Sequence, residues 1–382
     1  MSMLHAVRIS RAPLSGLSAV GVVWGGFAGF VPDIKAAVGA SDAGLGSALV
    51  MSSIGAMISM YLAPRLLNAL GRVALPVLGL VLCLAFFYPL MASSVPGLAL
   101  AMFGMGASVA ALDVSANVRI SALENRHKLH LMNVNHAMFS VAFGLTALFT
   151  AVVRKAGATP TMIMPLLALF CVGLAALMWE GRGRIAPPDH DSADTRSTAT
   201  PWAAIGLTAI ILFAAFVGEN ATEAWSALHI ERTLGGAAGE GSLGPFMLGL
   251  AMAIGRFSGQ FVAERLGEAR LILWSAVLGM IGAVVIAAAP SQLVALTGVG
   301  ILGLGMAVIV PSANSMLGKR VRDEQRSHAI SRAWMAGMLG FFLGPAMMGG
   351  LAELFGLRAS FAAVALVVSA IIPAVVALSR RG

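Results

Sequence analysis

The stretch GASVAALDVSAN at residues 106–117 returns as GMAVIVPSAN at residues 305–314, in each case a glycine and an apolar run ending in Ser-Ala-Asn. Other pairs follow in the same order, at an offset of about 196 residues. These are Leu70-Gly71 with Leu266-Gly267, Ala137 with Ala333, and Gly144 with Gly340. Matches that recur in order at a nearly constant spacing indicate two copies of one structural unit.

The composition around these stretches is that of a membrane protein. Of the 382 residues, 58% are hydrophobic and 11% are charged, and the mean hydropathy is +0.88. The charged residues cluster between apolar stretches of about 20 residues, the length that crosses about 30 Å of hydrocarbon. This composition excludes a soluble enzyme, a nucleic-acid binder and a secreted disulfide scaffold.

Twelve apolar segments are predicted to cross the membrane. Six precede a polar stretch and lie at about 12–34, 43–63, 73–94, 97–121, 129–152 and 160–180. Six follow it and lie at about 202–225, 243–263, 271–290, 292–316, 329–353 and 358–378. We therefore expect an all-α polytopic membrane protein of two six-helix bundles, residues 1–180 and 202–382, joined by a cytoplasmic linker at 181–201.

The basic residues predict the orientation of the chain. If both termini and the linker face the cytoplasm, that side holds 19 of the 25 Lys and Arg residues and the opposite side holds five. By the positive-inside rule, this bias places both termini in the cytoplasm. The net charge of +8 then reflects topology, and we expect a multi-pass protein of the cell inner (plasma) membrane.

One acidic side chain lies well inside a predicted span. A charge at the centre of a span costs about 3 kcal/mol on insertion scales, so Asp113 is a functional candidate. Asn117 follows one turn later and shares its helix face. Either Asp113 makes a structural hydrogen bond between helices, or its carboxyl binds and releases a proton or binds the hydroxyls of a substrate.

Other acids lie nearer to the ends of spans. Asp33, after Pro32, is either an ordinary solvated cap or a functional group. Glu219 and Glu223 are four residues apart, so they share a helix face and repel each other unless one is protonated or a cation lies between them. A titrating pair and a wet outer vestibule remain equally open interpretations of these two residues.

The remaining polar residues of the spans have competing interpretations. Arg256 needs an anion, a carbonyl or a route to the interface, and snorkelling to the cytoplasmic face is favoured. His136, with Asn133 or Asn135 nearby, is a packing residue or a ligand with equal weight. For three tryptophans, packing is favoured over stacking on a sugar ring: Trp24, Trp225 and Trp334. The sequence contains no metal-ligand spacing, nucleophile elbow or phosphate loop, so we expect no metal, no cofactor and no enzyme.

Four stretches resemble a known transporter family. They are Trp24 with Asp33-Ile34, Leu112-Asp113 with Ala116-Asn117, Trp225-Ser226, and Ile254-Gly255-Arg256-Phe257-Ser258-Gly259. The chain is similar through most of its length to the major facilitator superfamily, and within it to the fucose permease branch of sugar and proton symporters and its rhizopine permease-like relatives. The resemblance implies a substrate site between the two bundles, near the bilayer midplane.

The resemblance also implies roles for single residues. Asp113 would be the coupling carboxyl and Asp33 the second acidic group. His136 stands where that family has a glutamine, which changes the hydrogen bonds offered to a sugar. The candidate cavity residues that the resemblance implies are Asn117, Asn133, His136 and Trp225. Our interpretation of the residues adds Glu219 and Glu223 for proton coupling, and Trp24 and Asn314, the repeat mate of Asn117, for substrate binding.

These observations predict a secondary active transporter that carries a small polar solute, a sugar or a polyol-like compound, together with protons by alternating access. Its expected partners are the solute, protons and the lipid bilayer, and we expect a monomer that binds no nucleic acid. A proton-coupled exporter of drugs or amphipathic compounds is the main alternative. A transporter-shaped sensor is disfavoured because the only substantial cytoplasmic segment is a linker of about 20 residues.

Overall fold

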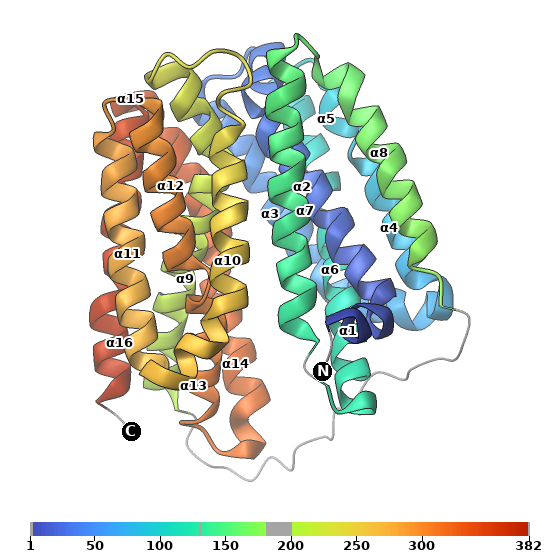
Figure 1. Ribbon diagram of the computed structural model, residues 1–382, viewed down its shortest axis with the longest axis vertical. Coiled ribbons are helices and arrows are strands. Elements are labelled where there is room, and N and C mark those ends of the chain that lie inside the picture. The colour runs from blue at the N-terminus through green and yellow to red at the C-terminus, as the bar shows by residue number, and fades with distance from the viewer. Residues whose placement is uncertain (1–2, 130, 181–200, 381–382) are drawn as a thin grey trace.

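The computed structural model describes residues 3–129, 131–180 and 201–380, and this part of the chain is helical without strands (Figure 1). Its first half contains α1 (Met3–Ile9), α2 (Arg11–Ala37), α3 (Asp42–Leu70), a 3₁₀ turn (Gly71–Val73), α4 (Ala74–Ala85), α5 (Tyr88–Met91), α6 (Val95–His127), α7 (Met132–Lys155) and α8 (Pro160–Leu177). Its second half contains α9 (Trp202–Leu228), a π-helical turn η2 (His229–Thr233), α10 (Leu243–Leu266), α11 (Glu268–Ala288), α12 (Gln292–Met306), α13 (Ile309–Gly318), α14 (Asp323–Gly337), α15 (Leu339–Ser369) and α16 (Ile371–Ser379).

Within the described residues these helices make twelve crossings, which confirms the prediction. Ten helices are long and apolar enough to cross a membrane, and one of them runs over 52 residues, His328–Ser379. That segment turns back at Gly356, where φ is 81° and ψ is 167°, so it contains two crossings. The shorter apolar helix Leu243–Gly259 supplies the last crossing. The predicted linker lies outside the described residues, apart from Pro201, so the bounds of the two bundles stay a prediction.

Prolines explain three interruptions within crossings. A proline ring clashes with the carbonyl four residues earlier and removes one helical hydrogen bond. Accordingly, α4 ends at Ala85, four residues before Pro89, and α15 ends at Ser369, four residues before Pro373. The break between α12 and α13 includes Ala307, four residues before Pro311. A crossing is therefore built here from two shorter helices without leaving its path.

The turns of the internal repeat share a glycine with positive φ. Gly71 ends α3 with φ 56°, and Gly267 ends α10 with φ 76°. Glycine is favoured at such helix ends because it adopts positive φ without a steric penalty. The repeated Leu-Gly pairs therefore end a helix in both bundles, with ψ of −120° at Gly71 and 154° at Gly267.

The two bundles meet along two seams, at which α7 packs against α10 and α3 packs against α15. Counted as membrane crossings, α3 and α10 are the second crossings of their bundles, and α7 and the first part of α15 are the fifth crossings. In both seams the second crossing of one bundle therefore contacts the fifth crossing of the other, as a two-fold relation between the repeats requires. Glycines bring the backbones together, since a Cβ on Gly249 would lie 2.8 Å from Gly144 and a Cβ on Gly349 would lie 2.9 Å from Gly46. Small residues are the usual means by which membrane helices approach closely.

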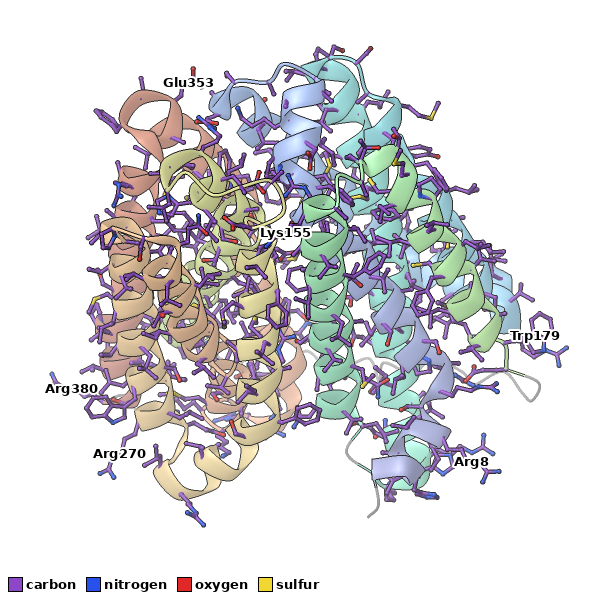
Figure 2. The ribbon with its side chains drawn as sticks, turned by 45° about the horizontal axis from the view of Figure 1, so that its top comes forward. Arg8, Lys155, Trp179, Arg270, Glu353 and Arg380 are labelled. Carbon is purple, nitrogen blue, oxygen red and sulfur yellow. The ribbon has the colours of Figure 1, made fainter. Side chains whose placement is uncertain are left out.

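The two ends of the molecule differ. The described chain ends lie at the lower end in Figure 1, which we name the terminal end, and the opposite end is the far end. The two bundles lie close together at the far end and separate toward the terminal end (Figure 1). Figure 2 shows Arg8, Arg270 and Arg380 at the terminal end and Glu353 at the far end.

Candidate functional site

The acid inside the first bundle is held by its helix neighbour. Asp113 lies half-buried on α6, and Asn117 lies one turn further along. The Nδ2 atom of Asn117 donates to the Asp113 carbonyl at 3.0 Å and to the Asp113 carboxylate at 3.2 Å. The shared helix face that the spacing predicts is therefore confirmed.

Helix α7 continues this polar contact. The Nε2 atom of His136 lies 3.0 Å from the amide oxygen of Asn117. Because an amide oxygen only accepts hydrogen bonds, the proton in this contact sits on Nε2 of His136. One turn later Ser140 donates its hydroxyl to the His136 carbonyl at 3.3 Å. The histidine thus connects α6 to the face of α7 that packs on the second bundle.

Arg256 crosses from the second bundle to the first. From α10 its guanidinium donates to the Ser140 hydroxyl at 2.6 Å and to the His136 carbonyl at 3.4 Å, and it pairs with Glu219 at 3.4 Å. It also lies 6.0 Å from the centre of the Phe139 ring. The expectation that Arg256 snorkels to the cytoplasmic face is wrong, because the seam itself supplies an anion, a hydroxyl and a carbonyl.

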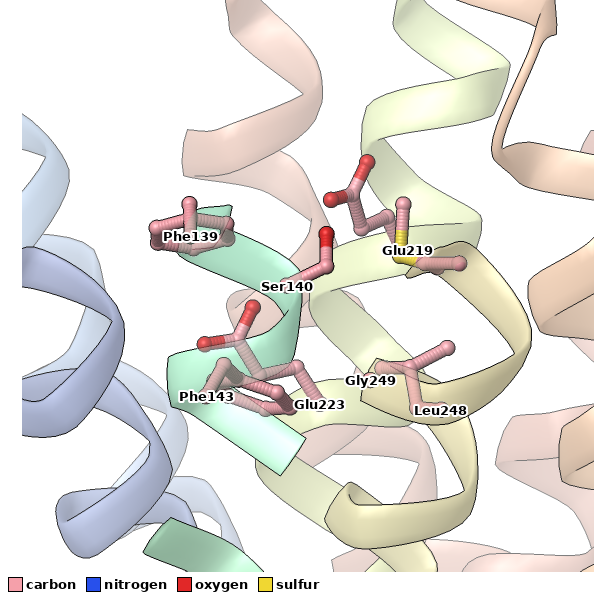
Figure 3. A pocket seen from close by; sticks show the side chains of 8 residues that line it. Phe139, Ser140, Phe143, Glu219, Glu223, Leu248 and Gly249 are labelled. Atoms are coloured by element: carbon pink, nitrogen blue, oxygen red, sulfur yellow. The ribbon is translucent and has the colours of Figure 1, made fainter. Parts of the chain in front are cut away.

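Glu219 and Glu223 line a pocket between the bundles. Figure 3 shows their side chains extending from α9 toward α7. The pocket is lined by Phe139, Ser140, Phe143, Glu219, Glu223, Leu248, Gly249 and Met252, and its space of about 230 Å³ is partly open to solvent. A cation beside the acid pair was one of two open alternatives, and the structure places Arg256 in an ion pair with Glu219.

Together these contacts form a polar chain that spans both bundles. It runs from Asp113 through Asn117, His136 and Arg256 to Glu219. It offers carboxylates that can bind protons and amide, imidazole and guanidinium groups that can bind hydroxyls or oxyanions. Sequence reasoning missed Ser140, although its position four residues after His136 places it on the same face of α7.

The repeat mate of Asn117 makes an equivalent contact in the second bundle. Asn314, on α13, accepts a hydrogen bond from Trp334 Nε1, on α14, at 3.0 Å. This pair parallels the contact of Asn117 with His136 between α6 and α7. Asn314 therefore has a partner within its own bundle, and its predicted contact with substrate stays a prediction.

The other predicted cavity residues have varied surroundings. Trp24 is half-buried on α2, and its ring lies edge-on to Phe27 with centroids 5.8 Å apart. Trp225 is completely buried within the hydrophobic core. Asn133 is exposed near the start of α7. Their roles in substrate binding stay predictions, and of the three Trp225 lies deepest in the core.

Asp33 lies apart from the polar chain, at the far end. Its carboxylate pairs with Arg154 Nε at 2.6 Å. Arg154 also pairs with Glu231, on the second bundle, at 2.5 Å and donates to the Ser242 hydroxyl at 3.2 Å. Sequence reasoning missed this network. Arg154 follows the predicted span 129–152, where a solvated charge is ordinary, so no local pattern indicated the network.

Comparison with known proteins agrees with this architecture. The profile of the Major Facilitator Superfamily matches residues 14–301 and 208–381. An uncharacterized MFS-type transporter of Yersinia pestis is 26% identical over 359 residues, which cover 93% of this chain and 91% of that protein.

Solved structures show the same fold at low sequence identity. A bacterial homolog of the human lysosomal transporter Spinster, in an inward-facing and occupied conformation, superposes with a TM-score of 0.78 at 15% identity, covering 100% of this chain and 98% of that one. A D-xylose-proton symporter superposes with a TM-score of 0.74 at 16% identity, covering 99% and 97%. The twelve crossings, the repeated six-helix bundles and the match along most of the sequence lead to one conclusion: this chain is a multi-pass membrane protein of the Major Facilitator Superfamily.

Proposed function

We propose that the protein is a proton-coupled symporter of a small polar solute, a sugar or a polyol-like compound. One observation carries this proposal: polar contacts lead from Asp113 through Asn117 to the His136 side chain, and from the His136 backbone carbonyl across the seam to Arg256 and Glu219. Carriers of this architecture bind substrate and coupling ions between the two repeats and rock the bundles around that site.

In the proposed cycle Asp113 is the coupling carboxyl. A proton on Asp113 removes a negative charge from the cavity, so the loaded carrier reorients without moving an uncompensated charge through the low-dielectric interior. Asn117 and His136 then contact the hydroxyls of the solute. Arg256 connects this part of the site to the second bundle, because its guanidinium donates a hydrogen bond to Ser140 on α7 and pairs with Glu219 on α9. Release on the other side returns the proton.

Orientation and structural neighbours bear on the placement of this carrier in the membrane and on its solute. The positive-inside bias assigns the terminal end, where the bundles separate (Figure 1), to the cytoplasm. The proposed protein acts as a monomer in the cell inner membrane, with both termini cytoplasmic. The D-xylose-proton symporter among the structural neighbours and the resemblance to the fucose permease branch both favour a sugar-like solute.

The test uses purified protein in vesicles that contain a pH-sensitive dye, with the membrane potential clamped. Sugars and polyols are added outside one at a time, without an initial pH gradient. We expect one class of solute to acidify the lumen as it enters with protons. Entry of labelled solute without acidification would reject proton coupling, and acidification must disappear with Asp113→Asn.

A proton-coupled exporter of amphipathic compounds is the second candidate, and the pocket favours it. Phe139, Phe143, Leu248 and Met252 place apolar surface beside Glu219 and Glu223, a combination suited to a lipophilic cation. Vesicles with an inward proton gradient separate the two candidates. A symporter accumulates labelled sugar in them, whereas an exporter accumulates no sugar and releases a preloaded lipophilic cation.

A further inference from the structure

A buried arginine at the far end has one partner in each bundle. The side chain of Arg154, on α7, is 2% exposed. Asp33 of its own bundle pairs with it at 2.6 Å, and Glu231 of the other bundle pairs with it at 2.5 and 3.2 Å. We name Asp33, Arg154 and Glu231 the first clasp.

A buried aspartate beside it has the same arrangement with the charges reversed. The side chain of Asp42, at the start of α3, is 6% exposed. Lys35 of its own bundle pairs with it at 3.2 Å, and Arg232 of the other bundle pairs with both of its carboxylate oxygens, one of them at 3.1 Å. We name Lys35, Asp42 and Arg232 the second clasp.

Two short segments supply the four residues that pair with the central charges, Arg154 and Asp42, of the two clasps. Asp33 and Lys35 lie two residues apart on α2, and Glu231 and Arg232 are neighbours in the π-helical turn η2. Neighbouring residues of a helical turn point in different directions, and in η2 Glu231 contacts Arg154 on α7 while Arg232 contacts Asp42 on α3. Single π-helical turns often occur at functional sites.

We propose that the two clasps hold the far end closed by sharing ions. When the far end opens, Arg154 keeps Asp33 and Asp42 keeps Lys35, while Glu231 and Arg232 leave together as a neutral neighbouring pair. No buried charge then loses its last partner in either state. This inference rests on the proposed alternating access only in requiring that the far end opens.

The energetics favour an exchange of partners over a simple lock. Removing the only partner of a buried charge is strongly destabilising, whereas a buried ion pair as such adds little net stability. A closed state held by unshared pairs would therefore strand charges on opening and trap the carrier. Shared ions keep both states close in free energy, as a carrier that cycles between them needs.

A third cross-bundle contact lies at the same end, and its donors are not shared. The Glu353 carboxylate, from α15, accepts from the Asp42 amide at 2.8 Å and from the Ala43 amide at 3.3 Å, at the positive end of the α3 dipole. After separation this helix end keeps the Ser41 hydroxyl, which accepts from the Gly44 amide at 3.1 Å. These are different amides, so on separation the Asp42 and Ala43 amides exchange Glu353 for water.

The two partners of each central charge must therefore act in opposite directions. Without Glu231, Arg154 has no attraction to the second bundle, so Glu231→Gln favours the open far end. Without Asp33, Arg154 depends on Glu231 alone, so Asp33→Asn favours the closed far end. For the second clasp, Arg232→Gln favours opening and Lys35→Gln favours closure.

The test measures distances across the far end in the full-length protein in lipid nanodiscs. Spin labels are placed at Ser93→Cys and Ser291→Cys, two exposed positions at the far ends of different bundles, with both native cysteines replaced. The lipid composition is chosen so that the unmodified clasps populate both a short and a long distance. We expect Glu231→Gln to raise the ratio of long to short distances roughly tenfold and Asp33→Asn to lower it.

Lys155→Gln is the matched control, because Lys155 is the exposed cation next to Arg154 and lies outside both clasps. It should leave the distance distribution unchanged, and thermal unfolding must show that every variant is folded. Shifts of Asp33→Asn and Glu231→Gln in the same direction, or no shift in either, would overturn the proposal. Because this measurement needs neither solute nor proton gradient, it fails or succeeds independently of symport.

Discussion

In the first bundle α6 contacts α7 through Asn117 and His136, and in the second bundle α13 contacts α14 through Asn314 and Trp334, both at 3.0 Å. The residue four positions before each asparagine differs, being an aspartate in the first bundle and Val310 in the second. The repeat therefore preserves the way in which neighbouring helices pack, while the intramembrane charge belongs to one copy alone.

The second bundle carries its acids on a different helix. Glu219 and Glu223 lie on α9, and the positions 196 residues earlier are Val23 and Phe27, which are buried in the core. Each bundle thus places carboxyls where the other has apolar side chains. The two sets of carboxyls belong to one site because the bundles pack together there, and Arg256 contacts both the first bundle and Glu219 of the second.

The largest effect is expected from removing the charge that distinguishes the copies. Asp113→Asn should reduce proton-driven accumulation to the level of protein-free vesicles, because an amide cannot bind and release the coupling proton. Binding and exchange of solute should persist. Val310→Thr, at the repeat mate, is the control and should keep coupling. Equal accumulation by Asp113→Asn and the unmodified protein across the pH range would remove Asp113 from the mechanism.

The connection between the bundles comes next. Arg256→Gln should lower the initial rate of solute uptake by about tenfold to a hundredfold, because truncating one partner of a buried ion pair leaves the other charge unpaired. Arg256→Lys keeps the positive charge but loses the forked guanidinium geometry, so its uptake rate should lie between those of Arg256→Gln and the unmodified protein. Both side chains retain 19% exposure, so the loss of stability should stay below the about 3–5 kcal/mol of a fully buried pair. Unchanged uptake by Arg256→Gln would show that the bundles are coupled elsewhere.

The two equivalent hydrogen bonds sharpen the comparison further. His136→Ala and Trp334→Phe each remove a contact to an asparagine, and each should lower the free energy of unfolding by about 0.5–1.5 kcal/mol. Only His136→Ala should also weaken solute binding, because only that pair belongs to the polar chain. Titration of solute by thermal shift distinguishes the two variants. Equal losses of affinity would mean that both copies contact the solute.

The smallest effects are expected from ion pairs at the terminal end. The first bundle has Arg119 with Glu180 at 2.6 Å, and the second has Lys319 with Glu268 at 2.8 Å. Exposed pairs contribute about 0–1 kcal/mol, and the Lys319 side chain is 68% exposed whereas that of Arg119 is 12% exposed. Glu180→Gln should therefore lower the Tm more than Glu268→Gln. The reverse order would indicate that the hydrogen bond from the Ser315 hydroxyl to Glu268 outweighs the deeper burial of the first pair.

Local patterns predicted those parts of the site that lie on one helix. The contact between Asp113 and Asn117 follows from a spacing of four residues, and so does the common face of Glu219 and Glu223. Sequence reasoning placed Arg256 wrongly because its partners come from other helices. From the sequence of one span, snorkelling is the only way to solvate a charge that can be foreseen. A seam that offers partners from other helices becomes known only from the packing of the bundles.

The sequence by itself determined the number of crossings, the internal repeat and the presence of ionisable groups inside the spans, because hydropathy and helical periodicity act over neighbouring residues. Only the tertiary structure decided which charges meet. Arg256 reaches Ser140 across 116 residues, Arg154 reaches Glu231 across 77, and Arg232 reaches Asp42 across 190. Such pairs depend on where two bundles cross, and the crossing is set by the packing of whole helix faces.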